Sequence, residues 1–229
     1  MLALADAGAE AIAADRPEAR FDELLGRSSR RTLRFDLSHA GAVKELAAEA
    51  TAVCGRIDVL VNCAGVGLHR GVAELGPGEN ERVLAVNLAA PIELTRILLP
   101  GMLERGRGHV VNVGSVVGFL ARPNEAVYAA SKAALAAFTE SLRAETRPRG
   151  VSASLVAPVA VDTAFFAERG VPYGRRWPRL LPPERIAGAV LAAIRSDRAQ
   201  VFVPRWIGLA VGLHALSPGL YRNLATTFD

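Results

Sequence analysis

Short apolar runs alternate with longer segments in which apolar residues recur every three or four positions. The short runs predict strands near residues 10–15, 32–36, 58–62, 109–114, 152–156 and 200–203. The helical spacing predicts helices over residues 17–25, 41–54, 79–104, 125–147 and 183–195, with residues 2–7 as the end of another helix. Strands that alternate with helices indicate βαβ units. The pattern therefore predicts an α/β fold, with a doubly wound parallel sheet between two layers of helices.

No repeat, low-complexity segment or polar linker divides the chain, so residues 1–229 are predicted to form a single domain. Residues 158–183 are rich in proline, arginine and aromatics without a clear period, which predicts a substrate loop or lid. Residues 204–229 are predicted to form an amphipathic C-terminal extension, broken near Pro218. We expect this extension to pack on the domain or on a second copy, with peripheral membrane contact as the alternative.

Composition excludes several classes of protein. The chain is 51% hydrophobic and 22% charged, which excludes a disordered or fibrous protein. The net charge of +4 comes from scattered arginines without a nucleic-acid motif, so no nucleic-acid partner is expected.

Cys54 and Cys63 have neither metal-site nor disulfide spacing, and no metal is predicted. With no signal peptide in residues 1–16 and an interrupted apolar stretch at 206–221, a cytoplasmic protein is expected.

Tyr128 and Lys132 lie four positions apart in the predicted helix 125–147, which places both side chains on one face. A cation about 4 Å from a phenol, at an effective dielectric constant near 20, stabilises the phenolate by roughly 4 kcal/mol. The pKa of Tyr128 is therefore expected to fall toward neutrality, which suits a general acid or base. Lys132 is one of two lysines among 27 basic residues, and a surface pair without a chemical role is the alternative.

Further polar residues follow the predicted strands. Ser115 ends strand 109–114, and Asn62-Cys63-Ala64-Gly65 ends strand 58–62, so both lie at the carboxyl edge of a parallel sheet. Asn87 lies in the middle of the predicted helix 79–104, where asparagine is unfavourable. A helix cap at Ser115 and a solvent-facing Asn87 are the structural alternatives to a functional role.

These polar residues form a set in a characteristic order, which consists of Asn62-Cys63-Ala64-Gly65, Asn87, Ser115, Tyr128-Ala129-Ala130-Ser131-Lys132 and the turn at 158–163. With this set, the chain resembles the short-chain dehydrogenase/reductase family over residues 1–204. The resemblance implies a Rossmann-like fold and hydride transfer between a nicotinamide and an alcohol or ketone. It implies that Tyr128 is the acid/base, that Ser115 binds the substrate oxygen and that Asn87 supports a water relay. Lys132 would lower the pKa of Tyr128 and hold the nicotinamide ribose.

The resemblance also implies a set of contacts with the cofactor. Asp36 and Leu37 correspond to contacts with adenine, Asn62 and Gly65 to the loop beside the ribose, and Val161 and Thr163 to contacts with the carboxamide and diphosphate.

Asp15 ends the first strand, where a carboxylate accepts hydrogen bonds from ribose hydroxyls and repels a 2′-phosphate, so NAD is favoured. Arg16 would instead accept NADP, and an N-cap at Asp15 is the structural alternative.

The expected substrate is an apolar alcohol or ketone, because Val116, Val117 and Phe119 follow Ser115, and Phe165 and Phe166 lie in the predicted lid. Ordinary packing is the alternative explanation of these side chains. The resemblance further implies a homodimer or homotetramer, and the alanine-rich helix after Tyr128 permits close helix contacts.

Three features depart from the family pattern. The 229 residues lack the opening strand and the Thr-Gly-x-x-x-Gly-x-Gly turn that approaches the pyrophosphate. We expect this strand to be missing from the middle of the sheet, so that strands 10–15 and 58–62 each lose a ladder partner. Either the true start lies upstream, or this is a shortened, catalytically silent relative that acts as a binding or assembly partner. Cys63 occupies a position at which the family commonly has a second asparagine. Val159 occupies a position at which the family usually has glycine, and the valine removes backbone freedom there.

Overall fold

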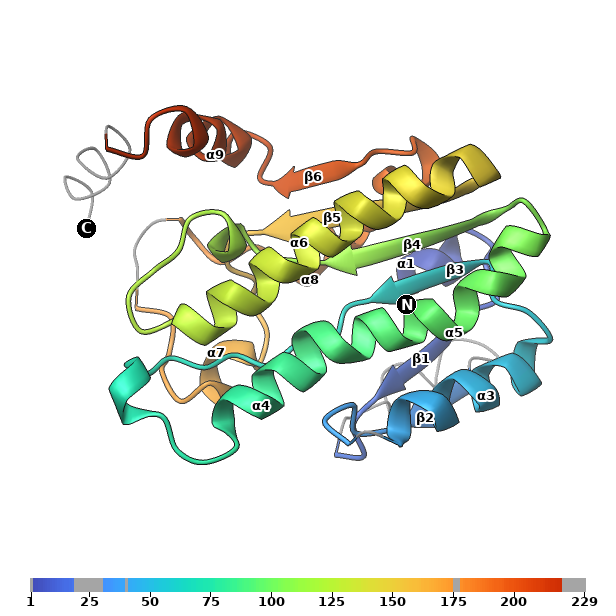
Figure 1. Ribbon diagram of the computed structural model, residues 1–229, viewed down its shortest axis with the longest axis horizontal. Helices are drawn as coiled ribbons and strands as arrows, with labels where there is room; N and C mark the ends of the chain where they lie inside the picture. The colour runs from blue at the N-terminus through green and yellow to red at the C-terminus, as the bar shows by residue number, and fades with distance from the viewer. Residues whose placement is uncertain (1, 19–30, 40, 175–177, 220–229) are drawn as a thin grey trace.

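In the part of the chain that the structure describes, six parallel strands form two sheets (Figure 1). The structure is a computed structural model and describes residues 2–18, 31–39, 41–174 and 178–219. The smaller sheet pairs β1 (Ile12–Asp15) with β2 (Arg31–Arg34). The larger sheet has the order β3-β4-β5-β6, formed by β3 (Val59–Asn62), β4 (Gly108–Val113), β5 (Val151–Pro158) and β6 (Gln200–Val203). All six predicted strands are confirmed.

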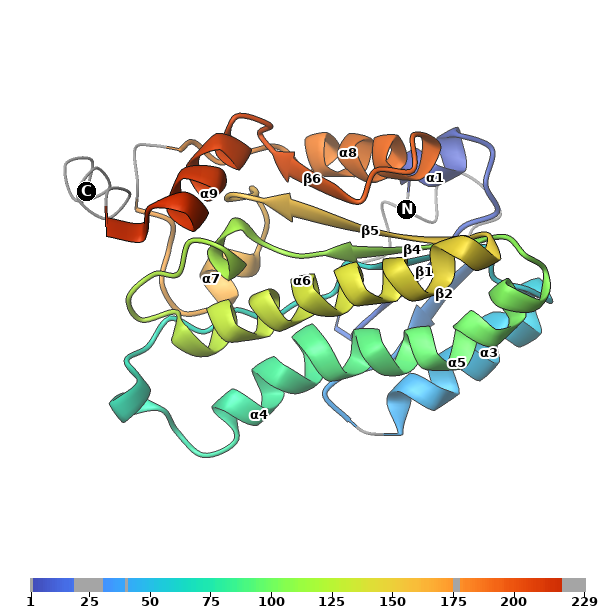
Figure 2. The same ribbon diagram turned by 45° about the horizontal axis from the view of Figure 1, so that its top comes forward.

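Helices cover both faces of the larger sheet. Figure 2 shows α3, α5 and α6 on one face, and α1 and α8 on the other. The helices are α1 (Leu2–Asp6), α3 (Ala42–Cys54), α4 (Glu79–Leu84), α5 (Ala90–Glu104), α6 (Ala126–Thr146), α7 (Phe165–Glu168), α8 (Pro183–Arg195) and α9 (Ile207–Leu216). The short helical turns are Val72–Glu74, Ala85–Ala89, Val116–Gly118 and Arg147–Arg149. This layering confirms the predicted α/β fold.

The strands β1 and β3 belong to different sheets, and among the described residues β3 has a ladder partner only in β4. The side of the sheet at β3 is correspondingly open: Val59 is 36% exposed, although it is a valine in a strand. The expectation that strands 10–15 and 58–62 each lack a partner is confirmed. The arrangement leaves the carboxyl ends of β1 and β3 on either side of one opening.

The core lies at β4 and β5, whose side chains are almost completely buried. Val111 and Val156 pack with α8, and Val110 and Val151 pack with Met102 of α5. Helices on both faces explain why these strands are apolar at consecutive positions rather than alternating. Residue-by-residue pairing from Gly108↔Val151 to Val113↔Val156 aligns the carboxyl ends of the two strands, which is where the candidate site lies.

Some predicted elements differ in the structure. The predicted helix 79–104 contains a π-helical turn, Ala85–Ala89, between α4 and α5. The predicted helix 17–25 lies almost entirely outside the described residues. The loop 158–183 contains α7 and one isolated bridge between Val161 and Leu181.

The predicted amphipathic pattern of the C-terminal extension is wrong for α9. This helix carries apolar residues on its buried side, at Ile207, and on its exposed side, where Leu209 is 79% and Leu216 is 89% exposed. The apolar residues are too closely spaced along α9 to occupy one side only.

Among the described residues, one helix passes the length and hydropathy criteria for a membrane span. It covers the 26 residues Glu79–Glu104. Its second half, α5, packs against α3 and β4, as the core helix of an α/β fold does.

Candidate active site

Asn87 connects three parts of the predicted site. The π-helical turn at Ala85–Ala89 carries Asn87 with no exposed surface, so the solvent-facing alternative is wrong. Its Oδ1 accepts a hydrogen bond from the Val66 amide, and its Nδ2 donates to the Val66 carbonyl, both at 2.9 Å. Nδ2 also lies 3.1 Å from Ser131 Oγ. A helix that widens by one residue at a buried polar group is a frequent feature of functional sites.

Lys132 is buried beside the loop that follows β3. Its Nζ donates to the Val113 carbonyl at 3.0 Å, at the end of β4. A Cβ placed on Gly65 would lie 3.4 Å from both Lys132 Nζ and Asn87 Oδ1. Gly65 therefore leaves the space through which the ammonium and the amide reach the loop. The structure thus brings Gly65, Asn87 and Lys132 together, as the sequence predicted.

The electrostatics of Tyr128 and Lys132 differ from the sequence prediction. Burial raises the pKa of Tyr128 to about 12, and the Ser115 side chain offsets part of that rise through a hydrogen bond. Burial also lowers the pKa of Lys132 to about 8. Nζ lies 6.0 Å from the centre of the Tyr128 ring. The expected fall in the phenol pKa is wrong here because desolvation of the buried phenol has the largest effect on its pKa and raises it.

Ser115 lies between the end of β4 and the turn Val116–Gly118. Its hydroxyl accepts from the Val117 amide at 3.2 Å, so Ser115 is a cap as well as a neighbour of Tyr128. This turn approaches α6 closely at Gly118, where a Cβ would lie 2.8 Å from the backbone of Lys132 and Ala133. Sequence reasoning missed Gly118, which lets the Ser115 turn contact the helix of Tyr128.

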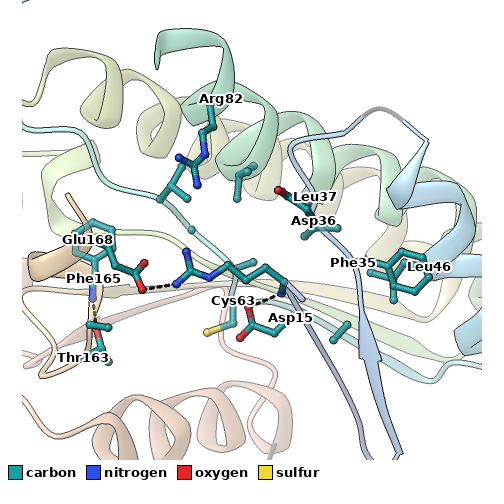
Figure 3. A pocket seen from close by; sticks show the side chains of 17 residues that line it. Asp15, Phe35, Asp36, Leu37, Leu46, Cys63, Arg82, Thr163, Phe165 and Glu168 are labelled. Atoms are coloured by element: carbon teal, nitrogen blue, oxygen red, sulfur yellow. Dashed lines mark hydrogen bonds and ion pairs between the residues drawn. The ribbon is translucent and has the colours of Figure 1, made fainter. Parts of the chain in front are cut away.

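A cavity of about 320 Å³ opens between the carboxyl ends of β1 and β3 (Figure 3). Asp15, Asp36, Leu37, Gly65 and Thr163, all predicted to contact the cofactor, line it. The remaining lining residues include Arg16, Phe35, Arg82, Phe165 and Glu168. The cavity therefore gathers most of the predicted nucleotide-binding residues.

Two carboxylates in this cavity have partners of their own. Asp15 Oδ1 accepts from the Arg16 amide at 2.8 Å. Asp36 Oδ1 accepts from the Ser38 amide at 2.9 Å, and hydrogen bonds from Ser38 lower the pKa of Asp36. Arg16 forms an ion pair with Glu168 of α7, which joins the two walls of the cavity.

Four predicted cofactor residues do not line the cavity: Asn62, Tyr128, Lys132 and Val161. Asn62 is buried and donates from Nδ2 to Asn112 Oδ1 at 2.8 Å, beneath the site. Asn112 donates in turn to Thr139 Oγ1 of α6 at 2.8 Å. Val161 forms the bridge to Leu181. Asn62 therefore connects the strands and α6 in this structure rather than facing the nucleotide cavity.

Comparison with known proteins identifies the family. Residues 1–172 match the family model described as short chain dehydrogenase. This chain belongs to the short-chain dehydrogenase family. It is 32% identical over 201 residues to dehydrogenase/reductase SDR family member 7B of Bos taurus, and this alignment covers 84% of this chain and 62% of the bovine one. The chain thus spans less than two thirds of the length of that relative.

Solved short-chain dehydrogenases show the same Rossmann-like fold. A short chain dehydrogenase/reductase from Burkholderia phymatum in complex with NAD is 26% identical, with a TM-score of 0.83 and coverage of 96% of this chain and 90% of that one. A metagenomic short-chain oxidoreductase in complex with NADP is 29% identical, with a TM-score of 0.72 and coverage of 87% of both chains.

The site of this short-chain dehydrogenase fits part of a nicotinamide dinucleotide. Asp15 and the residues after β2 suit an adenosine, and the Gly65 opening beside Lys132 suits a sugar with hydroxyl groups. The 229 residues contain no glycine-rich pyrophosphate turn.

Proposed function

We propose that this protein is a nicotinamide-dependent oxidoreductase that interconverts an alcohol and a ketone. The observation that carries the proposal is the convergence of Ser115, Tyr128 and Lys132 beside a nucleotide-sized cavity between β1 and β3. A parallel sheet binds ligands at this edge, where its strand order reverses. The dinucleotide supplies the hydride when bound, and the residues of this chain supply binding, orientation and the proton.

Tyr128 is the proposed proton donor to the substrate oxygen. A pKa of about 12 keeps the phenol protonated at neutral pH, which suits the reduction of a carbonyl. Ser115, in hydrogen-bond contact with Tyr128, orients the same oxygen. Lys132 is held by the Val113 carbonyl, and it keeps two donors for a ribose or for a water bound near Asn87.

We propose NAD as the preferred cofactor. Asp15 ends β1 at the cavity, and a carboxylate there accepts ribose hydroxyl groups and repels a 2′-phosphate. Arg16 is the residue that would attract the phosphate of NADP, but its guanidinium is paired with Glu168. The negative charge of Glu168 beside that guanidinium would repel a 2′-phosphate that approached Arg16.

The proposed substrate is apolar. Phe165 packs on Tyr128 with ring centres 5.5 Å apart, and Phe166 packs on Phe165 at 5.4 Å. These rings exclude water from the phenol, so an uncharged ketone is favoured over a charged one. Exposed alanines of α6, including Ala130, Ala133 and Ala137, support a homodimer or homotetramer that packs through this helix.

The proposal is tested by titrating the purified chain with NADH and NADPH, followed by assays of apolar ketones. We expect NADH to bind more tightly, and Tyr128→Phe to reduce kcat by about 10²- to 10⁴-fold while NADH still binds. Tyr173→Phe is the matched control, because it removes a lid hydroxyl that donates to the Pro178 carbonyl. Retained turnover in Tyr128→Phe would refute the assigned acid.

A second candidate is a catalytically silent binding or assembly partner. It is favoured by the division of the described strands into two sheets. The same titration separates the candidates. A folded chain that binds neither NADH nor NADPH excludes the enzyme and supports the silent relative.

A further inference from the structure

An ion pair is buried beside Tyr128 and connects two segments that are distant in sequence. Arg169 Nη1 donates to Glu125 Oε1 at 2.7 Å, and the two side chains are only 10% and 8% exposed. Glu125 is the N-cap residue that immediately precedes α6, and its carbonyl accepts from the Ala129 amide. Arg169 is the C-cap residue that immediately follows α7. The pair therefore joins the loop 158–183 to the first turn of the helix that carries Tyr128.

Arg169 is held in one orientation by further contacts. Its Nε donates to the Val171 carbonyl at 3.1 Å, and its guanidinium lies 4.6 Å from the centre of the Phe166 ring. A planar guanidinium that is stacked and hydrogen-bonded has little freedom to leave its carboxylate. The loop after β3 also packs closely against Phe165 and Arg169, because a Cβ on Gly67 would lie 2.6 Å from Phe165 Cζ and 3.0 Å from Arg169 Cβ.

The neighbouring residue on α7 makes a different contact. Glu168 pairs with Arg16 across the mouth of the nucleotide cavity, and both of these side chains are about 40% exposed, at 43% and 40%. An exposed pair contributes little and exchanges readily with water, whereas a buried pair leaves an unpaired charge when it opens. The carboxyl-terminal end of α7 therefore makes one exposed contact that opens readily, through Glu168, and one buried contact that stays attached, through Arg169.

We propose that Glu125 and Arg169 are positioning residues that anchor the substrate loop on α6 and so hold Phe165 against Tyr128. We call the ion pair between Glu125 and Arg169 the anchor. Its proposed role rests on the proposed function, since Tyr128 is the acid whose surroundings the ion pair determines. The Arg169 amide donates to the Phe165 carbonyl at 3.0 Å, so a movement of Arg169 is transmitted to the ring that covers the phenol. Figure 1 shows α7 beside the amino-terminal end of α6, as this role requires.

The anchor determines how water and substrate reach Tyr128. Without it, α7 separates from α6 and the phenol becomes accessible, although none of the proposed catalytic groups has changed. In an active enzyme the substrate then binds a less ordered loop. We therefore expect Arg169→Met to raise KM by about tenfold or more, with a smaller change in kcat.

The test uses the dinucleotide-free protein, so that it does not depend on turnover. Hydrogen exchange of amides 165–171 and acetylation of Tyr128 by N-acetylimidazole are measured by mass spectrometry. Arg169→Met is expected to accelerate both by about tenfold or more, since local opening exposes both groups. Arg169→Lys keeps the cation and is expected to restore most of the protection. Glu125→Gln is the second variant, and it is also expected to accelerate the hydrogen exchange and the acetylation.

Arg143→Met is the matched control. It breaks the partly buried pair with Asp197, with Nη1 to Oδ1 at 2.7 Å, near the other end of α6. It is expected to lower stability without changing exchange of residues 165–171 or labelling of Tyr128. Unchanged exchange and labelling in both Arg169→Met and Glu125→Gln, or equal acceleration in Arg143→Met, would overturn the anchor. Failure of the wild-type chain to bind NADH or NADPH would instead overturn the proposed function.

Discussion

The side-chain amide of Asn87 pairs with the backbone of Val66 through two hydrogen bonds of 2.9 Å, one in each direction. This contact connects the π-helical turn to the loop that follows β3, and that loop forms one wall of the nucleotide cavity. Since Asn87 has no exposed surface, no water can replace the amide if it is removed.

Replacement of Asn87 by leucine is therefore expected to lower the free energy of unfolding by roughly 2–4 kcal/mol, because buried polar groups lose their partners. Urea unfolding measures the loss. Thr95→Val is the control, since Thr95 is equally buried and its hydroxyl makes only one local bond, to the Pro91 carbonyl at 2.7 Å. Equal losses in the two variants would contradict a special role for Asn87.

Gly118→Ala is expected to lower the free energy of unfolding by about 1–3 kcal/mol, because its methyl group would overlap the backbone of α6. It should also separate the Ser115 turn from Tyr128 and reduce any turnover. Gly188→Ala in α8 is the control: its Cβ meets no atom within 4 Å, and alanine stabilises a helix by up to about 1 kcal/mol. Thermal unfolding distinguishes the two; a stable Gly118→Ala protein contradicts the close packing.

Lys132→Met is expected to raise the free energy of unfolding at pH 7 by about 1–3 kcal/mol, because burial of the ammonium is unfavourable. The folded pKa, about 8, lies below the ordinary value of 10.5. The unfolded chain thus binds more protons between these values, and the wild-type protein gains stability as the pH rises through them. The advantage of the variant should shrink from pH 8 to pH 10.5. Urea unfolding at pH 7 and pH 10 gives this difference, and a constant advantage contradicts the assigned shift.

Asp197 contributes stability that also increases with pH, but in the acidic range. Hydrogen bonding to Arg143 lowers the pKa of Asp197 below its ordinary value of 3.8, so its stabilisation is present above that value and is lost as the pH falls further. Asp197→Asn should cost about 1 kcal/mol at pH 7, a modest figure because the carboxylate is 40% exposed. Asparagine tolerates the positive φ of 46° at this position. The difference between the two proteins in urea unfolding should begin to shrink as the pH falls below 3.8 and should vanish only in more strongly acidic solution; a difference that stays constant as the pH falls contradicts the ion pair.

Much of the fold could be predicted because the signals are local. The strands around Val111 and Val156 are apolar at consecutive positions, and this is the pattern of parallel strands covered on both faces. The spacing of Tyr128 and Lys132 placed both on one side of α6, and the separate sheets at β1 and β3 agree with the missing strand.

The candidate site was predicted less completely. Asn62 donates to Asn112 of the neighbouring strand β4, which no local pattern indicates. Gly118 and Asn112 were missed because their importance depends on which backbone lies opposite them. Glu125 and Arg169 were also missed, since their 44-residue separation in sequence contains no spacing rule that would pair them.

The sequence by itself determined the order of strands and helices, the edge of the sheet at which the polar residues gather, and the family. These depend on periodicity and on motifs whose residues are close in the chain. Only the tertiary structure decided the protonation of Tyr128 and Lys132 and the anchoring of the lid. The physical reason is that desolvation and buried ion pairs depend on what packs around a group, and distant segments supply that packing.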